Sequence, residues 1–170
     1  PLGRVVAVSR PGFGAPGSAA TKVVYDNLDR PRAEVSPDAQ TTVVDQTFFT
    51  TQVTDPMGHR RTVVRDVDDR IVKSVESVDG HEIVTAYHYD PFHQVDRITD
   101  AKSNTIDVHY DHRGRRAWIK DPDAGPTTLY YNGFGDLRDT VRGPAVTHRK
   151  YDVLGRPVEV DDADGTATYS

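Results

Sequence analysis

The chain has 170 residues, a net charge of −5 and no cysteine, which excludes disulfide stapling and argues against a generic polyanion-binding surface. Valine (23) and threonine (17) far outnumber leucine (5), and aspartate (22) outnumbers glutamate (4). This bias favours strands and turns over helical bundles, coiled coils and βαβ folds. No apolar run approaches the ~18 residues that a membrane-spanning helix needs.

The first 21 residues are expected to hold a partial repeat followed by a loop rich in Gly and Pro, over residues 10–20. Pro1-Leu2-Gly3-Arg4 matches Val153-Leu154-Gly155-Arg156 further along the chain, without the two residues that precede it there. Residues 22–170 are expected to form one array of repeats. Because both ends fall inside a repeat, we expect the chain to be a fragment of a longer protein.

A Tyr-Asp pair recurs about every 21 residues along this array. Its clear copies are Tyr25-Asp26, Tyr89-Asp90, Tyr110-Asp111, Tyr131-Asn132 and Tyr151-Asp152. Two degraded copies, at Val44-Asp45 and Arg65-Asp66, fill the gap between the first and second clear copies. The step after the second degraded copy is longer than the others, so we expect less regular packing over residues 40–82 and an irregular loop near residues 78–82.

Each repeat also carries a turn signal just after the Tyr-Asp pair. Four residues after the tyrosine position stand Asp29, Asp69, His93, Gly114, Gly135 and Gly155, followed by Arg30, Arg70, Gln94, Arg115, Asp136 and Arg156. Gly, Asp and His tolerate positive φ better than most residues, which predicts a left-handed residue in a tight turn. A second turn, as in Asp55-Pro56-Met57-Gly58, lies about eleven residues after the tyrosine and has type I chemistry.

Two strands and two turns per repeat predict an antiparallel sheet, with strands such as residues 105–111, 115–121 and 127–132. The tyrosine column and the residues two positions before it, such as Val108 and Leu129, are expected on one apolar face. The other face would carry His88, His109 and Lys150, and is mostly polar. With only one apolar face, a series of 12–14 strands is expected to curl into a wall rather than form a two-layer sandwich.

Tyr110-Asp-His-Arg-Gly-Arg115 and Tyr151-Asp-Val-Leu-Gly-Arg156 resemble the YD repeat of Rhs proteins. Residues 53–60 are similar to the segment between repeats of that family, and the resemblance covers about residues 22–170. It points to the shell-forming repeats of bacterial toxin-delivery proteins, such as ABC toxin complexes and polymorphic toxins. The fold it implies is all-β, with antiparallel hairpin repeats in a curved, spiralling sheet that forms part of a hollow shell.

The same resemblance implies that this segment packages a toxin polypeptide for delivery outside the cell. Its partners would then be neighbouring repeats of the parent protein, the enclosed toxin and other toxin-complex subunits. The signature residues would be structural rather than catalytic. The string Asp55-Pro56-Met57-Gly58 matches the context of the family's self-cleaving site, but it stands at an ordinary turn, so we do not assign cleavage to it.

Other kinds of site find little support in the sequence. His88 and His109 share a column but lie two strands apart, too far to bind one metal ion together with His112. No Gly-x-Ser-x-Gly string and no cysteine supplies a nucleophile, so we expect no enzyme and no cofactor. The net charge of −5 argues against a nucleic-acid partner. Stacking of sugars on the tyrosine columns and Trp118 remains open. The alternative function is therefore a carbohydrate-binding or adhesion array at the bacterial cell surface.

Overall fold

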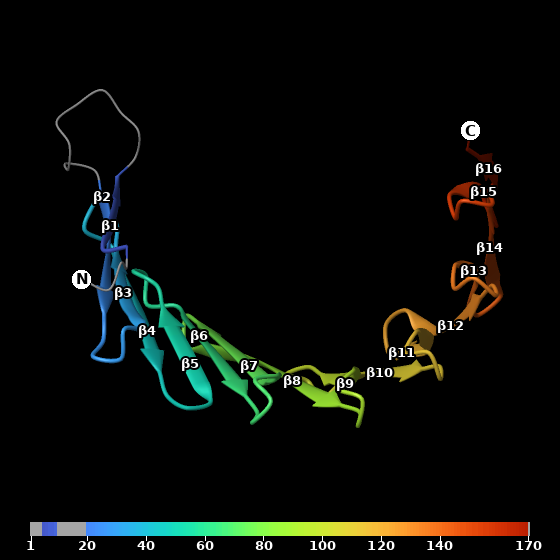
Figure 1. Ribbon diagram of the computed structural model, residues 1–170. Helices are drawn as coiled ribbons and strands as arrows, with labels where there is room; N and C mark the ends of the chain where they lie inside the picture. The colour runs from blue at the N-terminus through green and yellow to red at the C-terminus, as the bar shows by residue number, and fades with distance from the viewer. Residues whose placement is uncertain (1–4, 10–19, 170) are drawn as a thin grey trace. The chain divides into compact units, whose positions relative to one another are not determined.

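The computed structural model describes residues 5–9 and 20–169 (Figure 1). Residues 1–4 and nearly all of the loop expected over residues 10–20 lie outside this described part. The chain divides into two compact units, the first ending at Ala86 and the second beginning at Tyr87.

The described residues form sixteen strands and no helix, so the prediction of an all-β, antiparallel fold is confirmed. The strands are β1 (Ala7–Ser9), β2 (Ala20–Tyr25), β3 (Pro31–Val35), β4 (Thr41–Gln46), β5 (Thr50–Thr54), β6 (Arg60–Arg65), β7 (Ile71–Val78), β8 (His81–Tyr89), β9 (Val95–Thr99), β10 (Thr105–Tyr110), β11 (Arg116–Asp121), β12 (Gly125–Tyr131), β13 (Leu137–Arg142), β14 (Ala145–Tyr151), β15 (Pro157–Asp162) and β16 (Gly165–Thr168). They follow one another in sequence order within one sheet. Without a helix in the described part, no helix there is long and apolar enough to cross a membrane.

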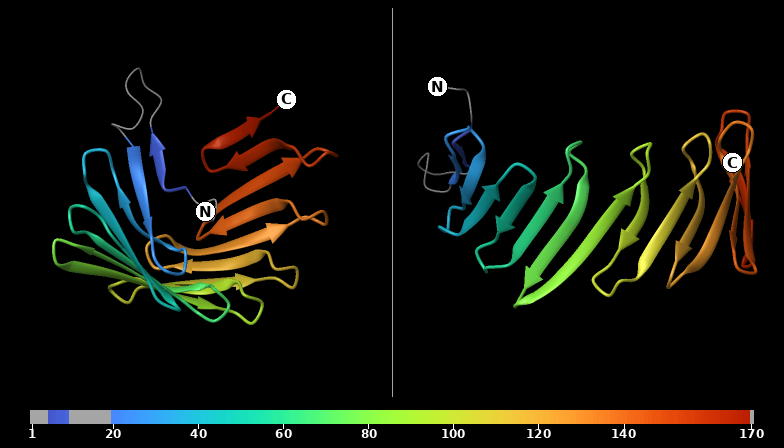
Figure 2. Two further views of the ribbon diagram at one scale, coloured as in Figure 1. Left: turned by 60° about the vertical axis from the view of Figure 1, so that its left-hand side comes forward. Right: turned by 90° about the horizontal axis from the view of Figure 1, so that it is seen from below.

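Each unit is a single layer of sheet. No hydrophobic side chain is buried among the described residues, and only Thr127 is buried at all, with 7% of its surface exposed. Contacts between strands in the described part join sequence neighbours only. In the second unit each strand is rotated relative to the one before it, as the right-handed twist of strands requires (Figure 2). Neither unit is therefore a two-layer sandwich. This outcome agrees with the prediction that was made from the single apolar face.

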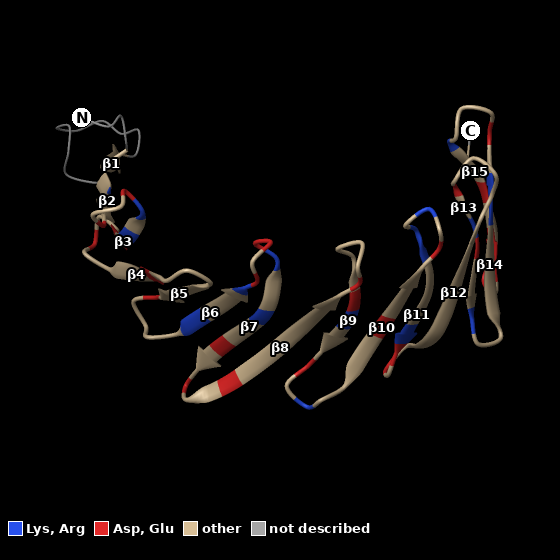
Figure 3. Cartoon of the chain, turned by 60° about the horizontal axis from the view of Figure 1, so that its bottom comes forward, with Lys and Arg blue, Asp and Glu red and all other residues tan. Residues whose placement is uncertain are grey.

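The two faces of the sheet differ in polarity. In the β10–β11 pair, Val108 lies opposite Ile119 on one face, whereas Asp107 lies opposite Lys120 on the other. Acidic and basic residues are interspersed along the strands and turns of each unit (Figure 3). The predicted alternation of an apolar and a polar face is thus confirmed in the second unit, to which β10 and β11 belong. No second layer of the described chain covers the apolar face.

The hairpins that follow the tyrosine position carry a β-bulge. In the β10–β11 hairpin, His109 pairs with Trp118 but Tyr110 pairs with Arg116, which leaves Ala117 as the extra residue. The same register shift occurs in the β2–β3, β6–β7, β12–β13 and β14–β15 hairpins. Bulges increase local twist and redirect the strand. Their recurrence therefore gives successive hairpins the same local bend.

The region around residues 78–82 differs from the prediction. Instead of an irregular loop, β7 and β8 form the longest hairpin, with unbroken pairing from Lys73 opposite Ala86 to Val78 opposite His81. Asp79 and Gly80 close it with φ values of 51° and 77°, as a type I′ turn requires. The extra residues of this repeat lengthen both strands, so the prediction of an irregular loop is wrong.

The first degraded copy is also misplaced in the prediction. Val44 and Asp45 lie inside β4, where they pair with Val53 and Gln52. The hairpin turn comes after Gln46, where the amide of Thr47 donates to the Thr50 carbonyl at 2.8 Å. Thr47 stands where the other turns of this kind have an aspartate. The prediction took Asp45, two residues earlier, for that aspartate.

Candidate functional site

The aspartate of the Tyr-Asp pair organises the turn that follows it. Asp111 Oδ1 accepts the backbone amides of Arg113 and Arg115 at 2.8 and 2.9 Å, and Oδ2 accepts Arg115 Nε at 2.8 Å. The amide of Gly114 donates to the Asp111 carbonyl at 2.9 Å, and the amide of Asp111 donates to the Arg115 carbonyl at 2.8 Å. One carboxylate thus satisfies the loop amides and anchors a guanidinium, a strong charge-assisted geometry.

This turn recurs along the array with limited variation. Arginine completes it in the pairs Asp26–Arg30, Asp66–Arg70, Asp111–Arg115 and Asp152–Arg156. In the β6–β7 hairpin the turn forms although Arg65 stands in place of the tyrosine. Asn132 substitutes for the aspartate at another turn, where its Nδ2 donates to Asp136 at 2.9 Å. Asp90 accepts the amides of Phe92 and Gln94 at 2.8 and 2.9 Å.

The left-handed residues lie where the turn signal placed them. The φ values are 60° for Asp29, 64° for Asp69, 66° for His93, 74° for Gly114, 104° for Gly135 and 76° for Gly155. The prediction of positive φ at this position is therefore confirmed.

Sequence reasoning missed that turns at the opposite ends of the strands use the same device. Asp55 Oδ1 accepts the amides of Met57 and His59, both at 2.9 Å, and Asp100 does the same for Lys102 and Asn104 at 2.8 Å. The turn at Asp55 was predicted, whereas the equivalent turn at Asp100, which no tyrosine precedes, was not. The signal that could have found both turns is an Asp with Gly or Ser three residues later, as in Asp55 with Gly58 and Asp100 with Ser103.

The signature tyrosines connect each hairpin to the previous one. The hydroxyl of Tyr110 donates to the Val95 carbonyl at 2.7 Å, and that of Tyr131 donates to the Arg116 carbonyl at 2.8 Å. Tyr25 and Tyr151 donate in the same way to the carbonyls of Val5 and Leu137. In the second unit each acceptor is the first residue of the return strand of the preceding hairpin. The tyrosine is therefore a clamp between repeats as well as part of the apolar face.

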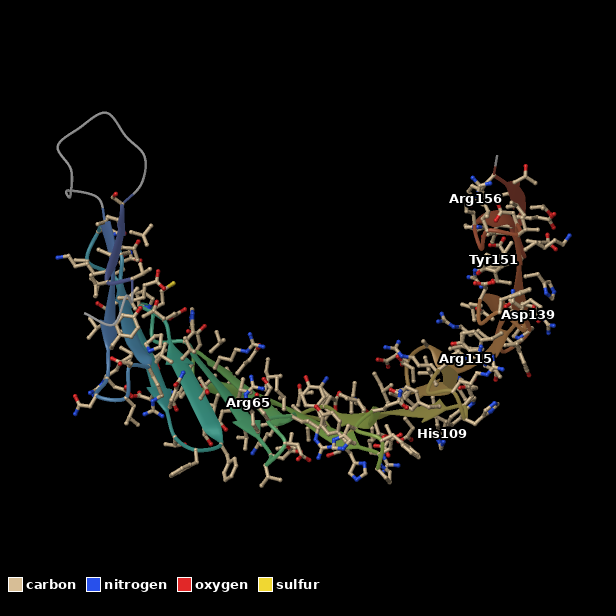
Figure 4. All side chains as sticks on the ribbon, viewed as in Figure 1. Arg65, His109, Arg115, Asp139, Tyr151 and Arg156 are labelled. Carbon is tan, nitrogen blue, oxygen red and sulfur yellow. The ribbon has the colours of Figure 1, made fainter. Side chains whose placement is uncertain are left out.

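Neighbouring turns are also in contact. The Arg115 guanidinium lies 4.2 Å from the centre of the Tyr131 ring, one repeat further on, a cation–π contact. Gln94 Nε2 donates to the Gly114 carbonyl at 2.8 Å. Arg115 and Tyr151 lie on one side of the sheet of the second unit, and His109 and Asp139 lie on the other (Figure 4). The signature residues thus form a continuous line of contacts on one side of this unit.

The turn carboxylates are held in their charged form. The Arg115 side chain, which donates to Asp111, lowers the pKa of that carboxyl to about 2. The pKa of Asp66 is lowered first by the Arg70 side chain, and those of Asp26 and Asp152 first by the amides of Arg30 and Arg156. These aspartates stay ionised at pH values that protonate an ordinary carboxyl.

The polar face carries ion pairs, and an open groove adjoins it. Arg97 Nε lies 2.6 Å from Asp107, and the rings of His109 and Trp118 lie 5.1 Å apart. The groove, of about 990 Å³, is lined by residues of both faces and of the turns at residues 90–94 and 111–114, among them Arg97, His109 and Tyr110. Within residues 5–9 and 20–169, no three His, Asp or Glu side chains are grouped to hold a metal ion.

The chain is a single-layer sheet whose hairpins are closed by Tyr-Asp turns and joined by tyrosine hydrogen bonds. These features define a YD-repeat β-sheet protein. The family match, described as Teneurin YD-shell, covers residues 19–170, so the chain belongs to the teneurin YD-shell family. This confirms the resemblance to shell-forming YD repeats.

Several solved structures have a similar fold. They include TcdB2-TccC3-Cdc42 (TM-score 0.71, 17% identity), TcdB2-TccC3 (0.70, 18%) and the Photorhabdus luminescens Tc holotoxin pore (0.68, 17%). Each likeness covers 85% of this chain but 8% of the other, so the chain spans a small part of the length of these relatives. At this identity the likeness shows the fold. No curated protein matches the sequence.

Proposed function

We propose that the chain is a wall segment of a YD shell that encloses a toxin polypeptide and shields it until delivery. The observation that carries this proposal is the uncovered apolar face of a sheet in which no described hydrophobic side chain is buried. An apolar surface of this extent normally contacts another polypeptide. An enclosed chain, held against the wall, would supply that contact.

The chemistry of the apolar face suits a cargo of unspecified sequence. Its side chains, such as Val108, Ile119 and Leu129, are half-exposed and lie in rows. Such a surface offers many weak, non-directional contacts. The role proposed here is therefore enclosure rather than catalysis, and the Asp-Arg and tyrosine clamps keep the wall in register while the cargo is held.

The toxin-complex relatives support the proposed setting. The chain would be continuous with neighbouring repeats of its parent protein, would contact the enclosed polypeptide, and would join other toxin-complex subunits outside the producing cell. The structural relatives include a Tc holotoxin pore and TcdB2-TccC3, and this likeness is the observation behind these partners.

Limited proteolysis of the full-length parent protein tests this function. We expect one polypeptide region to resist protease in the intact protein and to be digested once the shell is opened with denaturant. Replacing Val108 and Leu129 by Asp should weaken this protection, whereas Lys150→Gln on the polar face should leave it unchanged. Circular dichroism checks that the variants fold. Equal digestion of all regions in the native wild-type protein would refute enclosure.

One feature favours carbohydrate binding as a second candidate function. Arg97, Asp107 and His109 line the groove, and Trp118 lies beside it, with its ring 5.1 Å from that of His109. An aromatic face next to charged groups is a surface on which sugars stack. A glycan array with the chain, and with Trp118→Ala as the control variant, tests this candidate. Absence of any bound glycan would remove it.

A further inference from the structure

The turn between β12 and β13 departs from the other Tyr-Asp turns at three positions. Asn132 stands where the others have aspartate, and Asp136 stands where four of them have arginine. Gly133 stands at the position that His112 and Val153 hold in two of those turns. The result is an Asn-Gly pair, which occurs nowhere else in the chain. All three departures affect the chemistry of the Asn132 side-chain amide.

The fold does not require a glycine at position 133. Gly133 does not have a positive φ, and a Cβ there would have no atom within 4 Å outside the neighbouring residues of the chain. Val153 occupies the same position in a turn with the same hydrogen bonds, where the Leu154 amide donates to Asp152 Oδ1 at 2.9 Å. Neither backbone conformation nor space therefore accounts for this glycine.

An asparagine followed by glycine has a reaction of its own with water. The amide nitrogen of the next residue attacks the side-chain Cγ, and glycine hinders this approach least because it has no Cβ. The N–Cγ bond forms, the Cγ–Nδ2 bond breaks, and ammonia leaves a cyclic succinimide. Water then adds to one of the two imide carbonyls and opens the ring to aspartate or isoaspartate. The net reaction consumes one water and releases one ammonia, without an oxidant or a reductant.

The closed turn restrains the side chain that would react. Asn132 Oδ1 accepts the amides of Phe134, Gly135 and Asp136 at 3.0, 2.9 and 2.9 Å. Nδ2, which has to leave as ammonia, donates to Asp136 Oδ2 at 2.9 Å. Ring closure brings Cγ onto the Gly133 nitrogen and releases Nδ2, so it has to break or distort these four hydrogen bonds. The reaction is therefore held back while the turn is closed.

Deamidation would turn the clamp of this hairpin into a repulsive contact. In an aspartate at position 132, an oxygen replaces Nδ2 and faces Asp136 Oδ2, and two carboxylates at that distance repel each other. In the Asp111 turn the corresponding oxygen instead accepts Arg115 Nε at 2.8 Å. An isoaspartate would add an atom to the backbone and displace the amides that bind Oδ1. Either product therefore prevents the closed turn from re-forming as it was.

From these contacts we propose that Asn132-Gly133 is a site of spontaneous deamidation, which the closed turn suppresses and a local opening of the β12–β13 hairpin allows. The product then keeps the turn from closing with its native clamp, so a brief opening leaves a lasting weakness at this hairpin. The other Tyr-Asp turns carry aspartate at this position and have no amide to lose. The proposal does not depend on the enclosing function, because it concerns one turn and water.

Peptide mass spectrometry of the full-length parent protein, incubated at neutral pH, tests the site. We expect position 132 to deamidate in denaturant and to do so at least ~10-fold more slowly in the native protein, because a protected group reacts through local opening. In denaturant, Gly133→Ala should react more slowly than the wild type, since its Cβ hinders attack by the amide nitrogen. An Asn132 that stays intact in denaturant, or that reacts equally fast in both states, would overturn the proposal.

Variants at position 136 separate the effect of the clamp from general unfolding. Asp136→Ala removes the acceptor of Nδ2, so deamidation of the native protein should become several-fold faster. Asp136→Asn retains an acceptor oxygen and should stay close to the wild type. Circular dichroism checks that both variants fold. Equal native rates in the two variants would contradict protection by the clamp.

Hydrogen exchange of the β12–β13 amides tests the effect of the product. Asn132→Asp, which imitates one product, should exchange faster than the wild type, because the hairpin opens more often. Asn132→Asp combined with Asp136→Arg should restore protection, since the pair rebuilds the Asp-Arg clamp of the other turns. An Asn132→Asp hairpin as protected as the wild type, or a double variant as exposed as the single one, would overturn the proposed weakening.

Discussion

Gly155→Val tests whether the left-handed residue of the Tyr-Asp turn determines hairpin stability. Gly155 has a φ of 76°, and a Cβ at this position would find its nearest neighbour, Asp136 Oδ1, at 3.9 Å, an ordinary contact distance. Space is therefore available, and the penalty comes from the backbone alone. A left-handed conformation costs an L-residue about 1–2 kcal/mol, and a β-branched residue more. We expect Gly155→Val to lower the free energy of unfolding by about 1–2 kcal/mol or more.

Three further variants separate backbone strain from crowding. Gly155→Asn should be much milder than Gly155→Val, because Asn enters the left-handed region readily, as Asp29 and His93 do at equivalent positions. Gly114→Ala should be more harmful than Gly155→Ala, since a Cβ at Gly114 would lie 3.2 Å from Gln94 Nε2. This crowding would also disturb the hydrogen bond from Gln94 to the Gly114 carbonyl.

Urea denaturation followed by far-UV circular dichroism measures these differences, with the slope of the transition checked for each variant. A Gly155→Val variant that unfolds at the wild-type urea concentration would refute the turn assignment. An Asn variant as unstable as the Val variant would show that side-chain volume, not backbone conformation, limits this position.

Three further predictions concern the clamps. Tyr131→Phe should lower the free energy of unfolding by about 0.5–1.5 kcal/mol through loss of one hydrogen bond, whereas Tyr130→Phe, on the exposed polar face, should have little effect in the same urea titration. A carboxyl with a lowered folded-state pKa stabilises the fold above its unfolded pKa and loses this effect as the pH falls through its folded value. The contribution of Asp111 should therefore persist at pH 5 and disappear between about pH 4 and about pH 2. An Asp111→Asn variant should show a smaller change in urea midpoint across that pH range, and an unchanged acid dependence would contradict this. Arg115→Lys should lower the urea midpoint more than Arg113→Lys, because lysine keeps the charge but loses the paired hydrogen bonds and the planar stacking on Tyr131; equal midpoints would count against the clamp.

The sequence predicted the repeating hairpins and their turn conformation because both depend on local residue identity. Asp at the first turn position and a residue tolerant of positive φ at the fourth are short-range requirements, so Asp111 and Gly114 could be placed without knowledge of the fold. The single apolar face could also be predicted from the sequence, since strand residues alternate between faces. These features identify a YD-repeat sheet from the sequence alone.

The features that escaped prediction depend on contacts between hairpins or on alternative turns. The acceptor of the Tyr131 hydroxyl is a carbonyl fifteen residues earlier, in the preceding hairpin, and the bulge next to this carbonyl has no sequence signature. Near residues 78–82, an Asp-Gly pair closed a longer hairpin where extra length was expected to loop out. At Thr47 the turn forms without aspartate, and the nearby Asp45 shifted the predicted copy by two residues.

The absence of a buried core from residues 5–9 and 20–169 has a consequence for how the array gains or loses length. Contacts between strands in the described part join sequence neighbours only, so the stability of each hairpin depends on itself and on its two interfaces. Insertion or deletion of a whole hairpin leaves all other interfaces of this kind intact. Melting is then expected to advance from a free end, one hairpin at a time. A recombining gene could therefore lengthen or shorten the array in steps of one repeat.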